Sequence, residues 1–328
     1  MAKTDLGVQY ADKEYMLLEK RLKSVYSEAS KDIQAQMDVF FARYEKKNAK
    51  WLKDIEEGKA TKAEYQKWLK GQVFQGKQWL VKRDSICNTL AHANEVAFNM
   101  ANSVTPKVFQ VNGNYAAYQM ENSVGVNLDF SIYNPATVRE LLTKDTSLLP
   151  PKVLAISKNM QWNHQNIRNI VAKGIIKGDS INGIAKSLAN EMPNRNMNMV
   201  RTHARTMVTY AQNQGRLNRY EEAKAKGIDM EKEWMATLDN RTRDTHRELD
   251  GQRRPLNEPF EVEGYTIMCP ADPQAHPSLV YNCRCCMNSY IKKYPPQYKE
   301  RRDNITGDLI SNMTYREWEK WKRGTKNG

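Results

Sequence analysis

The sequence predicts a mainly α protein, with long N-terminal helices and a helical middle, followed by a small α+β C-terminal domain that carries a β-hairpin and a Cys/His cluster. Three observations predict this fold class. Of the 328 residues, 40% are hydrophobic and 27% are charged, and the mean hydropathy of −0.78 fits long helices with one solvated face. Apolar residues in the first half recur at steps of three and four. After Gly227 the pattern changes to short alternating segments and proline-rich loops.

The first 102 residues are predicted to be a long helical arm. Residues 11–57 are expected to form one long helix or a helical hairpin, and a second helical stretch is expected over about 61–102. Apolar side chains form a single stripe along this stretch, and this stripe must be buried against the following helices or another subunit. The apolar side chains with the spacing of a single buried stripe are Leu18, Leu22, Val25, Ala29, Ile33, Met37, Phe40, Tyr44, Trp51 and Ile55.

Residues 103–159 are predicted to be an irregular connector with one short helix at 135–144. Residues 108–111 are at best a short strand within it. Prolines and glycines interrupt the helical pattern here, because they favour turns and breaks over continuous helix. These interruptions are Pro106, Gly113, Gly125, Pro135, Pro150 and Pro151.

Residues 160–226 are predicted to be a basic helical lead-in to the C-terminal domain. Helices are expected at 160–177 and 181–191, the second with Ser180 as its N-cap, and a long helix is expected at 195–226. His203 lies on the apolar face of this long helix, where a packed core histidine is the expected role. On a helical wheel the opposite face carries a stripe about 60° wide, formed by Arg201, Arg205, Arg216 and Arg219.

Positive charge is concentrated in the same region. The net charge is +13, and residues 151–220 contain eleven Lys or Arg, Lys152 and Lys158 among them, against two acidic residues, a net of +9. We expect this segment to contact double-stranded DNA without reading its sequence, and a solvated basic face without a partner is the alternative. The residues expected to contact DNA are Arg201, Arg205, Arg216, Arg219, Lys173 and Lys177.

Residues 227–292 are predicted to form the α+β domain. Its elements are expected to be a strand, a turn, a short helix and a hairpin, at 233–238, 239–241, 242–249 and 259–268. Residues 293–328 are predicted to be a C-terminal tail with a short helix, for which Thr314 and Glu317 form a capping box.

The cysteines and the N-terminus bear on the cellular compartment. Cys87 stands alone, and the other four of the five cysteines lie within residues 269–286. An odd count without a recognisable secretory signal argues against a disulfide framework, so these thiols are expected to bind metal or to pack. No apolar stretch approaches the roughly 18 residues of a membrane span. We therefore expect a protein made and used in a cytoplasm.

The Cys/His cluster contains the residue types that bind zinc. Two thiolates, an imidazole and a fourth ligand would complete a tetrahedral site. Because the spacing is not that of a common zinc finger, a structural zinc site and metal-free packing of a hairpin against a helix both remain open, and a catalytic metal is least favoured. The candidate ligands are Cys283, Cys285 and His246, with Cys269, His276 or Asp250 in the fourth position.

Three separated blocks of this region resemble one known family: a motif from Trp234 to Gly251, then Pro270-x-Asp272-Pro273, then Asn282-Cys283-Arg284-Cys285. Their order and spacing are similar to the domain of phage head-morphogenesis proteins related to the F protein of bacteriophage Mu, and the likeness covers about residues 165–290. An extra Cys286, Cys269 and an insertion at 276–279 depart from the simplest pattern. The family motif maps onto Trp234, Asp239, Arg241, Thr242, Arg243, His246, Asp250, Gly251, Cys283, Arg284 and Cys285.

The resemblance implies a non-enzymatic minor capsid protein, present in few copies at or near the portal vertex inside the head. Its implied roles are procapsid assembly and DNA packaging or delivery. The implied partners are the portal protein, the major capsid or scaffold protein and double-stranded DNA, with no membrane partner. The implied location is the virion, and the host cytoplasm during assembly.

Two other functions remain open. The first is an assembly adaptor that binds portal or scaffold only, with the basic segment as its docking face. The second is an enzyme, since His246-x-Glu248 and Cys283-x-x-Cys286 are similar to the signature of zinc nucleobase deaminases, although no proline precedes Cys283. A toxin fused behind the domain is not expected, because only about 40 residues follow Cys286.

Overall fold

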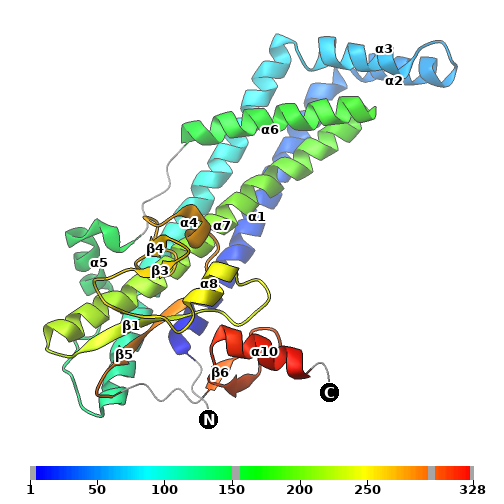
Figure 1. Ribbon diagram of the computed structural model, residues 1–328. Helices are drawn as coiled ribbons and strands as arrows, with labels where there is room; N and C mark the ends of the chain where they lie inside the picture. Colours follow the sequence, from blue (N-terminus) through cyan, green and yellow to red (C-terminus); the bar gives the residue numbers. More distant parts are fainter. Residues whose placement is uncertain (1–4, 150–155, 295–299, 326–328) are drawn as a thin grey trace. The chain divides into compact units, whose positions relative to one another are not determined.

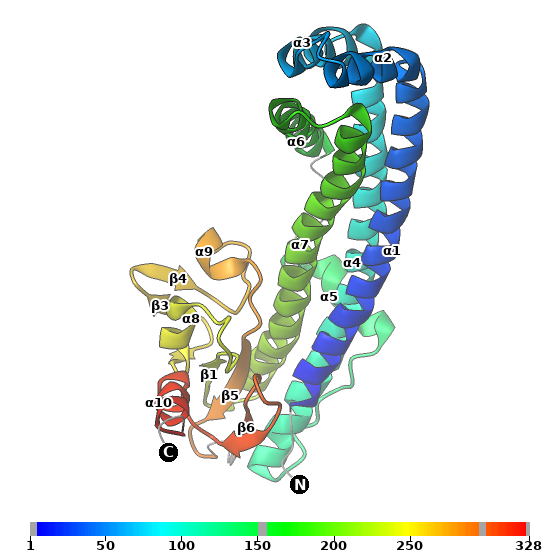
Figure 2. The same cartoon turned by 90° about the vertical axis from the view of Figure 1, so that its right-hand side faces the viewer.

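The computed structural model describes residues 5–149, 156–294 and 300–325, and it is built mainly of helices (Figures 1 and 2). Short strands and a His/Cys cluster occur in the C-terminal part. The predicted fold class is therefore confirmed. Among the helices described, none combines the length and the apolarity needed to cross a membrane. The end of the predicted connector, including Lys152, lies outside the described residues, as does the side chain of Lys158.

The chain forms two compact units, each assembled from separate stretches of sequence, whereas the prediction divided it into consecutive segments. Helices α1 (Leu6–Ala42), α4 (Lys77–Val124) and α7 (Ile181–Ala225) each contribute residues to both units. Unit 1 comprises Met1–Leu18, Met100–Lys152 and Thr202–Gly328, and unit 2 comprises Glu19–Asn99 and Val153–Arg201.

The regular elements of unit 2 are all helices, over the residues of it that the structure describes. The stretch predicted as one helix or a hairpin is two helices, because α1 ends at Ala42 and α2 (Glu45–Glu56) begins after two turn residues. After a turn at Gly58, whose φ of 72° suits glycine, Thr61 and Glu64 form a capping box that starts the next helix. The remaining elements are α3 (Lys62–Trp68), the π-turn η1 (Leu69–Val73), α6 (Ile156–Lys177) and parts of α1, α4 and α7.

The core of unit 2 is rich in aromatic side chains. Phe74 and Trp79 meet edge to face with ring centroids 4.9 Å apart, and Trp51 stacks on Trp68 at 6.1 Å. Ser180 caps α7 as predicted, since its hydroxyl accepts from the backbone N–H of Gly183 at 3.2 Å. One apolar core cluster, with Phe40, Trp68, Trp79, Ile167 and Ile184 among its members, joins the α2–α3 hairpin and the start of α7 to α1, α4 and α6.

Two helices run through prolines that predict breaks. Pro106 lies inside α4 and Pro193 inside α7, so residues 103–124 are helical, residues 108–111 are not a strand, and 181–225 is one helix. An interior proline costs a helix about 3 kcal/mol. Burial of apolar side chains next to each proline offsets this cost, because Val108, Phe109 and Met192 are fully buried. The predicted connector is therefore wrong over its first half, whereas its short helix is confirmed as α5 (Pro135–Lys144).

Unit 1 combines the ends of α1, α4 and α7 with the small α+β part. A three-stranded antiparallel sheet has the order β2-β1-β5, with Trp234 of β1 opposite Met287 of β5. The predicted hairpin is confirmed as the β3–β4 pair, and the predicted short helix as α8. The elements are β1 (Met230–Met235), α8 (Asp244–Leu249), β2 (Arg253–Pro255), β3 (Phe260–Val262), β4 (Tyr265–Ile267), α9 (Pro277–Val280) and β5 (Cys286–Ile291), preceded by the 3-10 turn η2 (Thr146–Leu148).

The C-terminal tail contains more structure than its predicted helix. That helix, α10 (Tyr315–Thr325), is present, and Thr314 with Glu317 forms the predicted capping box. A hairpin of β6 (Glu300–Arg302) and β7 (Leu309–Ser311) precedes it. Arg301 from this hairpin forms two hydrogen bonds of 2.7 Å to the Asp250 carboxylate, which joins the tail to the end of α8.

The two long helices of unit 1 approach each other closely at Gly215. A Cβ atom on Gly215 of α7 would lie 2.3 Å from the carbonyl oxygen of Phe109 on α4, closer than atoms can approach. We predict that Gly215→Ala lowers the free energy of unfolding by about 1–3 kcal/mol, because the helices must separate. Urea denaturation followed by circular dichroism measures the effect.

Gly183→Ala in the same helix is the matched control. Its Cβ would meet only the Asp179 side chain, at an ordinary 3.4 Å, and the Ser180 hydroxyl at 3.6 Å. This substitution should stabilise the protein by up to about 1 kcal/mol, since alanine favours helix. Equal effects of the two substitutions would show that the close approach does not exist.

Candidate metal centre

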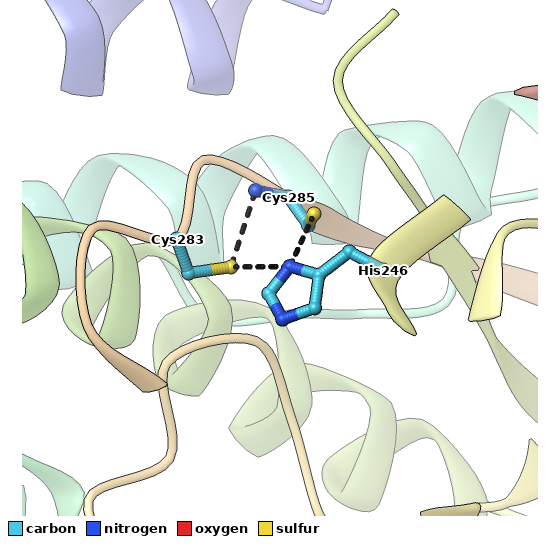
Figure 3. Close-up of side chains that lie close together, drawn as sticks. All are labelled: His246, Cys283 and Cys285. Carbon is cyan, nitrogen blue, oxygen red and sulfur yellow. Dashed lines mark hydrogen bonds between the residues drawn. The ribbon is translucent and has the colours of Figure 1, made fainter. Parts of the chain in front are cut away.

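Three side chains converge at the meeting point of α8 and the loop before β5 (Figure 3). Nδ1 of His246 lies 3.7 Å from Sγ of Cys283 and 3.4 Å from Sγ of Cys285. The three ligand atoms all lie within 4.8 Å of one another, and each residue is 2% exposed. The structure thus brings together the imidazole and the two thiols that the motif singles out.

His246 is held in one orientation. Its Nε2 lies 3.0 Å from the carbonyl oxygen of Leu279, and a carbonyl can only accept, so Nε2 carries the proton. In the neutral imidazole Nδ1 is then the acceptor, and it points toward the two sulfur atoms. The indole of Trp234 packs edge to face against the imidazole with centroids 5.3 Å apart.

Helix α7 positions the cysteine loop, and β5 runs beside this helix (Figure 2). The Thr209 hydroxyl donates to the carbonyl of Cys283 at 2.7 Å, and the Asn213 amide donates to the carbonyl of Cys285 at 3.2 Å. Asn213 also accepts from the backbone N–H of Met287 at 2.8 Å. Sequence reasoning missed both residues, although two polar side chains four residues apart on a packed helix face were a usable signal.

The two thiols differ in their tendency to ionise. Burial by itself raises the pKa of Cys283, but hydrogen bonds from the thiol and backbone N–H of Cys285, with the charge of Arg243, bring it below its usual value. Burial and the neighbouring Cys283 sulfur raise the pKa of Cys285 well above its usual value.

The predicted candidates for a fourth ligand do not join this group in the described residues. The Cys269 thiol is buried and accepts from the Gln214 amide at 3.6 Å. His276 is exposed, stacks on Tyr265 at 4.5 Å and lies 2.8 Å from the Ser278 hydroxyl at the start of α9. Asp250 accepts from the backbone N–H groups of Ala236 and Tyr315, as well as from Arg301. The prediction that Cys269 or His276 supplies the fourth ligand is therefore wrong, because the side chain of each has other partners.

The other family-motif residues brace the same loops. Asp239 accepts from Arg284 at 2.8 Å, from the Thr242 hydroxyl at 3.1 Å and from the backbone N–H of Arg241 at 3.0 Å. Arg243 donates to the carbonyls of Ser278 and Tyr281. Gly251 has a φ of 81°, which only glycine adopts without strain, and its N–H donates to the carbonyl of Trp234.

The expectation that the α7 arginine stripe faces DNA is wrong for its second half. Arg216 and Arg219 are fully buried. Arg216 donates to Asp5 at 2.6 Å, and Arg219 donates to Glu222 at 2.6 Å and lies 3.5 Å above the Tyr133 ring. A helical wheel shows which residues share a face but not what covers that face, and here α4, the N-terminal residues and the segment at residues 130–133 cover it.

The remaining predicted DNA contacts fall into two groups. Arg205 pairs with Asp12 at 2.7 Å, and Arg201 pairs with Glu19. Lys173 and Lys177 are exposed on α6. Of the residues predicted to contact DNA, the lysines of α6 are therefore the most accessible to a polyanion.

His203 of α7 is partly buried with its ring edge on to Tyr281, and burial lowers its pKa, as expected for a packed histidine.

Comparison with known proteins gives a family and three relatives. Residues 165–288 match the family of phage Mu protein F like proteins. Minor head protein GP7 of Bacillus phage SPP1 is 27% identical over 327 residues, 97% of this chain and 96% of GP7. NAD(+)–arginine ADP-ribosyltransferase EFV of Enterococcus faecalis is 32% identical over 205 residues, 61% of this chain and 40% of EFV. The uncharacterized protein YqbB of Bacillus subtilis is 24% identical over 58% of this chain and 61% of its own length, and no solved structure matches.

The burial of Arg216 predicts a structural role that a DNA contact would not have. Arg216→Met should lower the free energy of unfolding by about 3 kcal/mol, because it leaves the Asp5 carboxylate and the Met287 carbonyl without their donor. Lys173→Met, at an exposed site, should change it by less than about 0.5 kcal/mol. Urea denaturation of the two variants makes the comparison, and equal stabilities would refute the structural role.

Proposed function

The chain belongs to the Mu F-like phage minor head proteins, and from this premise we propose that it acts without turnover, bound at or near the portal vertex inside the head. There it would contribute to procapsid assembly and to DNA packaging or delivery. The observation that carries this proposal is the similarity to GP7, which extends over 97% of this chain and 96% of that minor head protein. A shared role is better supported by likeness over the whole length of both chains than by one shared domain.

The site geometry supports a structural rather than a catalytic role. A nucleobase deaminase needs a glutamate beside its metal-bound water and a pocket for the base. Glu248 is instead exposed, with its carboxylate 3.9 Å from Arg316, whereas His246 and both cysteines are buried. The ADP-ribosyltransferase in the name of EFV belongs to a protein of which the alignment covers 40%, so the likeness does not transfer that activity.

We predict that the chain is incorporated into heads in few copies and that it does so by binding to the portal protein. The test is co-expression with the portal, scaffold and major capsid proteins of its own phage, followed by purification of particles and quantitative mass spectrometry. The chain should copurify with complete particles and be lost from particles assembled without portal protein. Equal amounts in both would refute the portal location, and absence from both would refute the assignment to the head.

We further propose that unit 2 makes a sequence-independent contact with duplex DNA. Unit 2 contains 23 Lys and Arg against 13 Asp and Glu, so it carries +10 of the net +13. The densest part runs from the α2–α3 hairpin to the start of α4, with nine exposed lysines and four acidic residues between residues 46 and 77. These lysines are Lys46, Lys47, Lys50, Lys53, Lys59, Lys62, Lys67, Lys70 and Lys77.

The composition of this hairpin favours contact with phosphates over contact with bases. Lysine is a strongly hydrated point charge that neutralises phosphate without base recognition. The indoles of Trp51 and Trp68 stack on each other within the core cluster of unit 2, so they are not presented for stacking on single strands. Binding should therefore be weak, sensitive to salt and blind to sequence.

Lys46, Lys50 and Lys53 lie on one face of α2. Replacing Lys46, Lys50 and Lys53 with Gln should weaken binding to duplex DNA and reduce the slope of log K against log salt by about 2–3, since each neutralised phosphate contributes about 0.9. Fluorescence anisotropy with two duplexes of unrelated sequence measures both quantities. The two duplexes should bind equally.

Three exposed lysines of unit 1, Lys107, Lys224 and Lys293, provide the matched control triple. Their replacement with Gln removes the same charge and should leave the slope nearly unchanged. Equal losses in both triples would refute the location of the contact. Wild-type affinity that does not vary with salt would refute DNA contact and favour an adaptor that binds portal or scaffold only.

A further inference from the structure

We propose that His246, Cys283 and Cys285 bind one zinc ion, which cross-links α8 to the loop leading into β5. The three ligand atoms come from two segments more than thirty residues apart and meet within 4.8 Å in the interior of unit 1 (Figure 3). Thiolate and imidazole are the ligands zinc prefers.

The spacing of the ligand atoms fits a single ion. Zinc–sulfur and zinc–nitrogen bonds of about 2.3 and 2.0–2.1 Å, at a tetrahedral angle, place nitrogen and sulfur roughly 3.5 Å apart. The Nδ1 to Sγ distances are 3.4 Å for Cys285 and 3.7 Å for Cys283, on either side of that value. Both sulfur atoms can therefore share one metal with the imidazole after small side-chain adjustments.

The hydrogen bond at the far side of the imidazole is the second observation. Nε2 of His246 donates to the carbonyl of Leu279 at 3.0 Å, which leaves the lone pair of Nδ1 directed at the sulfur atoms. Metal-bound histidines typically donate their other ring N–H in this way, which fixes both the tautomer and the ring orientation. The side chains of Thr209 and Asn213 donate to the carbonyls of Cys283 and Cys285 and so hold the loop that carries the sulfur atoms.

Metal-free packing satisfies these groups less completely. Nδ1 has one lone pair and can accept from only one of the two neighbouring thiols. One ion at their centre engages the nitrogen and both sulfurs together. Because all three residues are 2% exposed and the described residues add no carboxylate to the group, the ion is assigned a structural role. A water molecule then fills the fourth position of a tetrahedral ion.

The experiment is metal analysis of the full chain purified without chelators. Wild type should contain one zinc per chain, and Cys283→Ser with Cys285→Ser should contain at least about tenfold less. The matched control replaces two other buried cysteines, Cys87 and Cys269, with serine and should retain the zinc. Zinc that is absent from wild type, or retained in the Cys283/Cys285 variant, would overturn the proposal.

A second variant covers the case in which the serine variant fails to fold. His246→Cys keeps a zinc ligand at the same place, so it should retain the metal. With cobalt in place of zinc, it should also show a stronger thiolate-to-cobalt charge-transfer band than wild type, because a third sulfur is bound. An unchanged band in a folded, cobalt-loaded variant would show that residue 246 is not a ligand.

Discussion

The structure of unit 1 depends on the burial of the Arg216 guanidinium, a group that stays protonated in any fold and must therefore keep its partners. Asp5 supplies the opposite charge, Asn112 of α4 accepts at 3.1 Å, and the carbonyl of Met287 on β5 accepts at 3.0 Å. These partners come from three stretches of chain that are distant in sequence. The N-terminal residues, the end of α4 and the sheet consequently have to assemble around α7 together, since the loss of one partner leaves a buried charge unsatisfied.

Arg216 belongs to a polar seam along α7 that replaces a missing strand. In the sheet order β2-β1-β5, strand β5 has a strand on only one side. Side chains of α7 spaced by four, three and four residues reach the main chain at and just before its start: Thr209, Asn213, Arg216 and Tyr220. Backbone groups that an edge strand would expose are thereby satisfied inside the protein. The same seam fixes the position of the cysteine loop, so the placement of Cys283 and Cys285 next to His246 follows from the packing of β5 on the helix.

Local signals in the sequence predicted local structure, and failures arose where distant partners decide. The Ser180 cap, the Thr314–Glu317 capping box and the hairpin after residue 259 are each specified by neighbouring residues, and each is present. The breaks predicted around Pro106 and between residues 191 and 195, where Pro193 lies, are absent because the cost of a proline is local, whereas the burial that offsets it comes from other segments. The convergence of His246 with the Cys-x-Cys pair was predictable from residue type and motif. The exclusion of Cys269 and His276 was not, because it depends on how the intervening hairpin and loop fold back.

The distribution of charge shows why a count of basic residues is a weak guide to a nucleic-acid surface. Arginine, with its planar and weakly hydrated head group, is suited to buried pairs, and on the second half of α7 it is used in that way at Arg216 and Arg219. Lysine keeps its charge in water, and the exposed lysines of α2 and α3 remain available to a polyanion. Positive charge in this chain is therefore divided between buried arginine pairs within unit 1 and exposed lysines on unit 2. A partner that is attracted by the net positive charge has to contact the exposed lysines. The buried guanidiniums contribute to the long-range electrostatic field but cannot be contacted.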